Sequence, residues 1–449
     1  MTKMFGTNGI RGIANEYLSC ELSLKVGKAI AQVLGPGPIA IAMDTRVSSD
    51  MIRSAVSSGL MSMGVDVHDL GMIPTPALQY YVKTHDVTGG VMITASHNPP
   101  EFNGIKCISA DGTECSHEEE SAIEEAYDRE LVTVSWDRIG SMETIEGAGE
   151  AYIDAVVSKV DAELIRNADL TVVLDCANGA SVHTSPLLME KLGVHAVVLN
   201  GEADGMFPGH YSEPVEENLS ELKEEVVRVK ADLGIAHDGD ADRCVFVSDT
   251  GKYLPGDVGL ALLSILCMKT TKGKKQVVST VALSNMVEDA INDAGGALVR
   301  TAVGSPIVAR RMIDDGSPIG GEDNGGIIFA DHQYCRDGAL AAARMIEFAA
   351  RYGSIQKHVD DLPEYTTIKT AVSCPDDRKT YLIERLAEQY SNEKIDRTDG
   401  LKITFSDGWV LLRPSGTEPK FRIYSESKDP KVAKDRSEQF VKDVSRILG

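Results

Sequence analysis

No apolar run in this 449-residue chain is long enough to cross a lipid bilayer. The longest, Val258 to Met268, falls short of the roughly 20 residues that a membrane-spanning helix needs. Met1 to Gly6 lacks the apolar segment of a secretory signal peptide. The sequence therefore predicts a cytoplasmic protein with no membrane partner.

Cysteine occurs in no pattern that carries chemistry. The eight cysteines are scattered, and no Cys-x-x-Cys pair or neighbouring histidine cluster is present. Free thiols in a reducing compartment explain this distribution better than a disulfide framework or a zinc site.

Basic runs are also missing. The formal net charge is −23, from 45 Lys and Arg against 68 Asp and Glu, which excludes nucleic acid as a partner. Solubility accounts for most of the surface acids. An anionic substrate would need a locally positive cleft inside this negative protein.

The pattern of short β-rich runs and helical segments indicates several α/β domains, because the chain is too long for one hydrophobic core. We expect strands at 39–43, 65–70, 171–174, 194–199, 233–236, 276–281 and 297–301, and helices at 22–34, 51–63, 186–192, 216–230, 284–294 and 307–314. This order restarts twice, which predicts three similar α/β domains with mixed, mostly parallel sheets.

The C-terminal part of the chain has a different pattern. Strands are expected at 368–374, 402–405, 409–413 and 421–426, around helices at 381–390 and 432–448. These predict a small α+β domain. The expected domains are 1–150, 151–252, 253–366 and 367–449.

A serine lies where a buried strand opens into a loop. The apolar run Val91 to Ile93 leads into Ser96-His97-Asn98, which ends at two prolines. Ligands of α/β proteins bind at such strand ends. Ser96 is therefore a candidate nucleophile or phosphoryl carrier, with Lys106 close in sequence.

Three carboxylates alternate in Asp238-Gly239-Asp240-Ala241-Asp242-Arg243. Alternate side chains of an extended loop point the same way, so all three can converge on one hard cation. An EF-hand fails because Arg243 stands where glycine is needed and a strand follows. An acidic surface turn is disfavoured directly after an apolar strand. We expect Mg²⁺, which leaves room for phosphate oxygens.

Two further loops carry polar side chains. Arg413 to Arg422 holds hydroxyls and cations around Gly416 and fits neither a P-loop nor a dinucleotide turn; it predicts a phosphate site, against an ordinary hairpin loop. In Gly320 to Gly326, Glu322 and Asn324 alternate and suit sugar hydroxyls, although a flexible glycine turn explains this segment equally well.

Two other segments are weaker signals. Gly6 to Gly12 is a glycine-punctuated loop with one arginine, Arg11. Asp44-Thr45-Arg46 ends a strand, and a helix-capping turn explains it, because Ser48, Ser49 and Asp50 precede a helix. Together the serine, metal, sugar and phosphate loops suit phosphoryl transfer on a phosphorylated sugar.

Four of these loops resemble the signature loops of the α-D-phosphohexomutase family, in the family's order and over essentially the whole chain. They are Thr94-Ala95-Ser96-His97-Asn98-Pro99, Asp238-Gly239-Asp240-Ala241-Asp242-Arg243, Gly321-Glu322-Asp323-Asn324-Gly325 and Arg413-Pro414-Ser415-Gly416-Thr417-Glu418-Pro419. The opening Phe5 to Gly12 is also similar to the family.

The resemblance implies four domains around a central cleft and a phosphoserine enzyme. Phosphorylated Ser96 would share one Mg²⁺ with Asp238, Asp240 and Asp242. Phosphate would pass to a hexose phosphate, giving a 1,6-bisphosphate that turns over and returns its other phosphate. A hexose 1,6-bisphosphate would act as activator, and the protein would be a monomer or homodimer.

The resemblance also implies roles for the remaining residues. Arg11, His97 and Lys106 would serve proton transfer and charge stabilisation. Glu322 and Asn324 would hold sugar hydroxyls. Arg243 would also bind substrate. A distal phosphate site would consist of Arg413, Ser415, Gly416, Thr417 and Arg422.

The sugar is less clearly indicated. The Arg-Pro-Ser-Gly-Thr-Glu-Pro loop is similar to that of the phosphoglucosamine mutase branch, especially its archaeal members. Two segments depart from the bacterial pattern: Asn324-Gly325-Gly326 replaces Ser-Gly-His, and Val303-Gly304-Ser305 replaces Val-Gly-Asp. Phosphomannomutase/phosphoglucomutase activity is the alternative within the family. A metal-dependent phosphosugar hydrolase is the alternative outside it, and a non-enzymatic regulator would need neither Ser96 nor all three aspartates.

Overall fold

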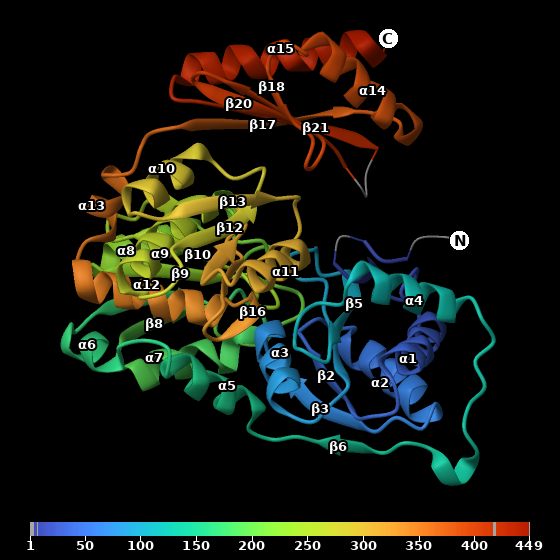
Figure 1. The fold of residues 1–449 in the computed structure, drawn as a ribbon. Helices are drawn as coiled ribbons and strands as arrows, with labels where there is room; N and C mark the ends of the chain where they lie inside the picture. The colour runs from blue at the N-terminus through green and yellow to red at the C-terminus, as the bar shows by residue number, and fades with distance from the viewer. Residues whose placement is uncertain (1–3, 7, 416–418, 449) are drawn as a thin grey trace.

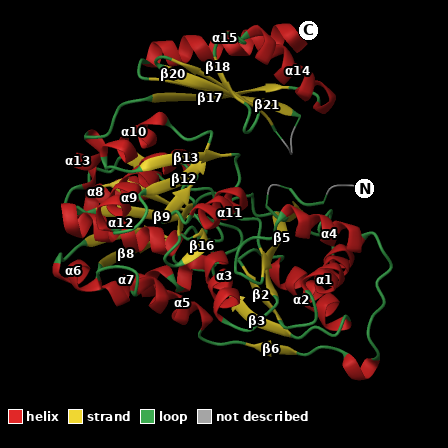
Figure 2. Cartoon of the chain, in the orientation of Figure 1, coloured by secondary structure: helices red, strands yellow, loops and turns green. Residues whose placement is uncertain are grey.

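The structure is a computed structural model and describes residues 4–6, 8–415 and 419–448. Four sheets follow one another along the chain. In Figure 1 the first domain lies on the right, the second and third pack together on the left, and the fourth lies above them. Helices accompany every sheet (Figure 2). The expected fold class is confirmed.

The first sheet has six strands in the order β1-β5-β4-β2-β3-β6. Its strands are β1 (Ile10–Ile13), β2 (Ile39–Met43), β3 (Val67–Met72), β4 (Gly89–Ile93), β5 (Phe102–Ser109) and β6 (Met142–Thr144). Its helices are α1 (Cys20–Leu34), α2 (Ser49–Ser62), α3 (Thr75–Thr84) and α4 (His117–Tyr127). Strand β2 packs Ile39 and Ile41 into one core, and Ala40 and Ala42 into another, because successive side chains point to opposite faces.

The second and third sheets have five strands each, in the orders β11-β10-β9-β7-β8 and β13-β12-β14-β15-β16. The strands of the second are β7 (Thr171–Asp175), β8 (His195–Leu199), β9 (Leu233–His237), β10 (Cys244–Ser248) and β11 (Tyr253–Leu254). Those of the third are β12 (Gln276–Thr280), β13 (Ala297–Thr301), β14 (Ile319–Gly321), β15 (Ile327–Phe329) and β16 (Gln333–Arg336).

Helices connect and cover these two sheets. They are α5 (Ala148–Val157), α6 (Ala162–Asn167), α7 (Ser185–Leu192), α8 (Ser220–Val229), α9 (Gly256–Thr270), α10 (Asn285–Asp293), α11 (Ser305–Asp315), α12 (Gly338–Tyr352) and α13 (Ile355–Asp360), with short 3-10 turns at Trp136–Arg138, Ala180–His183 and Glu216–Asn218. None of the helices within the described residues has both the length and the apolarity to cross a membrane.

The three α/β sheets share one plan. In each, a central strand pairs in parallel with two neighbours, and the second of these neighbours then pairs with an antiparallel strand. That junction is β4–β5, β9–β10 and β14–β15 in the three domains. The predicted triplication is thus visible in strand order, and the loops at the three junctions occupy equivalent places.

The fourth sheet is antiparallel throughout, in the order β17-β21-β20-β19-β18. It consists of β17 (Thr366–Ser373), β18 (Lys394–Asp396), β19 (Leu401–Phe405), β20 (Gly408–Pro414) and β21 (Lys420–Ser427), with α14 (Asp376–Gln389) and α15 (Pro430–Leu448). Trp409 and Leu411 pack against Val281 and Ala282 of the third domain. The residue limits of the four domains stay a prediction.

Candidate active site

The serine, metal and sugar loops lie at the three equivalent junctions. Ser96 follows β4, Asp238 follows β9, and Glu322 follows β14. Each loop leaves a buried parallel strand and returns along an antiparallel one. The strand ends thus fix the bases of all three loops.

Arg46 holds the serine loop in place. Its guanidinium donates to the carbonyl oxygens of Ser96 at 2.8 Å and Asn98 at 2.7 Å, and it pairs with Asp44 at 3.0 Å. Ser48 is the N-cap residue of α2 but makes no side-chain cap hydrogen bond, whereas Asp44 and Arg46 bind each other and the serine loop. Ser96 itself has φ +52°, a left-handed conformation that is unusual for a residue with a side chain.

Ser96 contacts the metal loop directly. Its hydroxyl donates to Asp238 Oδ2 at 2.8 Å, and Arg243 Nε donates to the same oxygen at 2.9 Å. Burial raises the pKa of Asp238 to about 6, against the lowering effect of Arg243. A Cβ on Gly239 would lie 2.5 Å from the Ser96 carbonyl oxygen, so only glycine lets the two loops approach this closely.

Asp240 and Asp242 each have one hydrogen-bonded oxygen and one oxygen without a hydrogen-bond partner. Lys106 Nζ donates to Oδ2 of both, at 2.6 and 3.2 Å, and Thr75 of α3 also donates to Asp240 Oδ2. Oδ1 of both aspartates is buried without a hydrogen-bond partner. Burial alone would raise the pKa of Asp240, but Lys106 holds it well below its usual range.

These oxygens fit a divalent cation. Asp238, Asp240 and Asp242 offer ligand atoms within 4.8 Å of one another, and they form the group with this property among the described residues. Unpartnered buried carboxylate oxygens are costly unless a cation or donor meets them. All-oxygen ligation suits Mg²⁺.

The other predicted catalytic residues lie in the same cluster. His97 Nδ1 is 3.4 Å from Ser96 Oγ. Burial, with Arg243 and Arg11 nearby, lowers the pKa of His97 to about 2, so its imidazole is uncharged. Arg11 donates to Asn98 Oδ1 at 2.8 Å. Burial lowers the pKa of Lys106, but Asp240 and Asp242 outweigh it and raise the net value.

Of the two predicted sugar ligands, Glu322 belongs to the buried cluster. It accepts from the Gly304 amide at 3.1 Å, and burial raises its pKa despite Arg336 nearby. Asn324 is exposed, and its side chain accepts from the Gly326 amide at 3.1 Å. The two side chains therefore do not converge in this structure.

The predicted phosphate loop lies in the fourth domain. Arg413 Nε donates to Asp399 Oδ2 at 2.8 Å, and Asp399 also accepts from the Val303 amide of the third domain. Ser415 is buried and its amide donates to the Lys420 carbonyl. Arg422 lies opposite Arg413 in the sheet. Gly416 and Thr417 lie outside the described residues.

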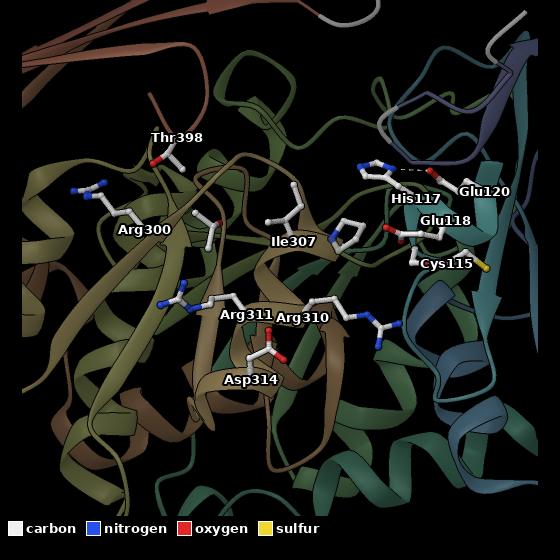
Figure 3. Close-up of a pocket in the computed structure, with 13 residues that line it drawn as sticks. Cys115, His117, Glu118, Glu120, Arg300, Ile307, Arg310, Arg311, Asp314 and Thr398 are labelled. Carbon is white, nitrogen blue, oxygen red and sulfur yellow. Dashed lines mark hydrogen bonds and ion pairs between the residues drawn. The ribbon is translucent and has the colours of Figure 1, made fainter. Parts of the chain in front are cut away.

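A cavity of ≈ 540 Å³ opens between the first, third and fourth domains (Figure 3). His117 and Glu118 of α4 line it on one side, and Arg310 and Arg311 of α11 on another. Ser96 and the aspartates are not among its lining residues. We therefore assign the chemistry to the buried cluster.

Family models match all four domains of the chain. The models are those of the phosphoglucomutase/phosphomannomutase family. They match domain I at residues 2–132, domain II at 150–251, domain III at 255–365 and the C-terminal domain at 370–443. The chain belongs to the phosphoglucomutase/phosphomannomutase family.

Several archaeal family members are similar over their full length. A phosphoglucomutase/phosphomannomutase of Thermococcus kodakarensis is 41% identical and covers 100% of both chains. A probable phosphoglucosamine mutase of Methanopyrus kandleri is 41% identical, covering 100% of this chain and 99% of its own. A phosphoglucosamine/phosphogalactosamine mutase of Sulfurisphaera tokodaii is 39% identical, with the same coverage.

Solved structures of family members have the same fold. A Burkholderia thailandensis family protein matches with TM-score 0.88 at 24% identity, covering 99% of this chain and 97% of its own. Aspergillus fumigatus N-acetylphosphoglucosamine mutase, in complex with GlcNAc-6P and magnesium, matches with TM-score 0.65 at 14% identity, covering 99% and 96%.

Three residues of the cluster were missed by the sequence analysis. Arg336 donates to Asp242 Oδ2 at 2.6 Å, and Glu114 accepts from Ser305 Oγ at 2.7 Å. Thr75 binds Asp240. Each lies in a domain other than its partner's, and no local pattern distinguishes it. Gly326, which packs against the stem of Arg336, was the one feature of the sequence that could have pointed to this arginine.

Proposed function

We propose that the protein is a phosphoglucosamine mutase, which interconverts glucosamine 6-phosphate and glucosamine 1-phosphate through phosphorylated Ser96 and a 1,6-bisphosphate intermediate. The observation that carries this proposal is the hydrogen bond from the Ser96 hydroxyl to Asp238, beside oxygens of Asp240 and Asp242 that have no hydrogen-bond partner. Family relatives named phosphoglucosamine mutase support the sugar.

In the proposed reaction, the bond between Ser96 Oγ and phosphorus breaks as a sugar hydroxyl oxygen bonds to the same phosphorus. Overall, the proton of that hydroxyl passes to Ser96 Oγ, which becomes a hydroxyl again, so atoms and charge balance. Lys106 and Arg11 stay protonated and stabilise charge, while uncharged His97 lies beside the oxygen. Mg²⁺, held by Ser96 phosphate and the three aspartates, would neutralise charge on the transferred group.

The remaining assignments belong to the same proposal. Glu322, Asn324 and Arg243 would contact the sugar, and Arg413, Ser415, Gly416, Thr417 and Arg422 would bind the distal phosphate. A hexose 1,6-bisphosphate would activate the enzyme by phosphorylating Ser96. A cytoplasmic location and a monomer or homodimer remain predictions.

The first test measures the phosphoryl carrier. Intact mass of the purified protein should show a phosphate-sized increment that is absent from Ser96→Ala, and that variant should lose nearly all mutase activity. Substantial activity in Ser96→Ala, with inorganic phosphate released as fast as substrate disappears, would instead indicate a phosphosugar hydrolase.

The second test measures the sugar. Glucosamine, mannose and glucose phosphates are compared by kcat/KM, and glucosamine 6-phosphate should give the highest value. A clearly higher value for mannose or glucose 1-phosphate would support the second candidate, phosphomannomutase/phosphoglucomutase. That candidate is favoured by the name of the Thermococcus kodakarensis relative.

A further inference from the structure

Arg336 lies where acids of three domains meet. It ends β16, and its guanidinium donates to Asp242 of the metal loop at 2.6 Å. It also lies 3.8 Å from Glu322 of the sugar loop and 3.8 Å from Glu114 of the first domain. Its side chain is 10% exposed. A single buried cation therefore connects the metal loop to the sugar loop.

Gly326 makes room for this arginine. A Cβ on Gly326 would lie 2.2 Å from Arg336 Cδ and 3.0 Å from its Cγ, so the stem of the arginine passes directly over the glycine. Arg336 could not keep its present place if position 326 carried a side chain. The position of the arginine therefore depends on the glycine.

The contact determines which oxygen of Asp242 is available. Oδ2 accepts from both Arg336 and Lys106, whereas Oδ1 has no hydrogen-bond partner. The two carboxylate oxygens of Glu322 also have different neighbours. Oε1 accepts from the Gly304 amide, and Oε2 faces Arg336. The planar guanidinium can address two carboxylates at fixed angles, which a lysine ammonium cannot.

We propose that Arg336, admitted by Gly326, is a positioning residue that presents Asp242 Oδ1 to the divalent cation and ties this aspartate to Glu322. The inference rests on the proposed metal-assisted phosphoryl transfer and on no particular sugar. Groups that orient a metal ligand from outside the coordination sphere typically change metal affinity by about 10- to 100-fold.

The experiment measures Mn²⁺ binding to the full-length protein by electron paramagnetic resonance, without sugar phosphate. Arg336→Lys keeps the positive charge but loses the planar guanidinium that can donate to two carboxylates. Gly326→Ala keeps the arginine and its charge but displaces its stem. Each should weaken Mn²⁺ binding about 10-fold or more, and the double variant should bind no more weakly than the weaker single variant. Arg344→Lys, an arginine paired with Asp331 away from the cluster, is the matched control.

Other outcomes would overturn the proposal. If Arg336 acted only through its charge, both charge-preserving variants would bind Mn²⁺ like the wild type, and Arg336→Gln would bind it more tightly. If it contacted the sugar phosphate instead, KM would rise with metal affinity unchanged. Should Gly326→Ala fail to fold, Arg336→Lys decides alone. A wild-type protein that binds Mn²⁺ but lacks mutase activity would refute the proposed function and leave this inference standing.

Discussion

At the residue scale, Arg46 shows how buried charge shapes the serine loop. Its side chain and that of Asp44 are fully buried, and the arginine bridges four carbonyl oxygens between Ser96 and Phe102. A buried charge pair of this kind contributes little net free energy but is strongly destabilising when one member is removed.

We therefore predict that Arg46→Met lowers the free energy of unfolding by about 3–5 kcal/mol, because Asp44 would remain buried without its partner. Urea unfolding followed by circular dichroism measures the change. Arg129→Met, which removes an exposed ion pair with Glu125, should cost less than about 1 kcal/mol. Equal losses in the two variants would contradict the prediction.

Sequence reasoning could identify residues whose chemistry is local. Ser96 and the three aspartates follow apolar strands, and strand ends converge in α/β folds, so their meeting could be predicted. Arg336 could not be found in this way, because it is 94 residues from Asp242 and meets it only through domain packing. Asn324 matched the expected spacing, yet its exposed side chain accepts a hydrogen bond from the Gly326 amide within the same turn.

At the element scale, helix α1 was placed closely because its apolar residues recur on one buried face. Strand β2 was placed closely as a short apolar run, with both of its faces buried. Helix α9 was missed because it is buried almost all round, and such helices show no amphipathic pattern. Helix α12 was missed although its apolar residues do recur with helical periodicity. The antiparallel β5 was missed because its buried residues include Asn103, Lys106 and Ser109, which interrupt the apolar pattern of a strand.

Helix α4 begins with a complete capping box. Ser116 Oγ accepts from the Glu119 amide, and the Glu119 carboxylate accepts from the Ser116 amide. Ser116→Ala should therefore lower stability by about 1 kcal/mol, measured by thermal unfolding. Ser54→Ala, on the exposed face within α2, is the control and should leave stability nearly unchanged. No difference between the two would argue against the cap.

At the scale of the whole molecule, charge is distributed unevenly. The net charge is −23, yet Arg11, Lys106, Arg243 and Arg336 gather around the aspartates in the interior. This agrees with the expectation that an anionic substrate requires a locally positive cleft. These interior cations lie beside the aspartates of the metal loop.

The contact between the third and fourth domains contains a buried lysine. Lys402 donates to the Val281 carbonyl at 2.7 Å and lies 4.2 Å from the ring centroid of Trp409. Burial, with Arg300 adding to it, lowers the pKa of Lys402 to about 7. Between this value and its ordinary pKa, the unfolded chain binds a proton that the folded protein has released.

Stability should therefore rise with pH from about 7 to about 10, by up to about 1.4 kcal/mol per pH unit from this group. Lys402→Met should remove this contribution, since it keeps the aliphatic stem without a titrating amine. Thermal unfolding of both proteins across this range gives the two slopes. Identical slopes would show that Lys402 does not carry the dependence.

The left-handed backbone of Ser96 has an evolutionary consequence. This conformation costs a residue with a Cβ roughly 1 kcal/mol or more, and glycine would adopt it freely. Selection for folding alone would thus replace this serine with glycine, and only selection for its hydroxyl opposes that drift. A descendant freed from its chemistry would be expected to gain stability at the very position where it lost its reactivity.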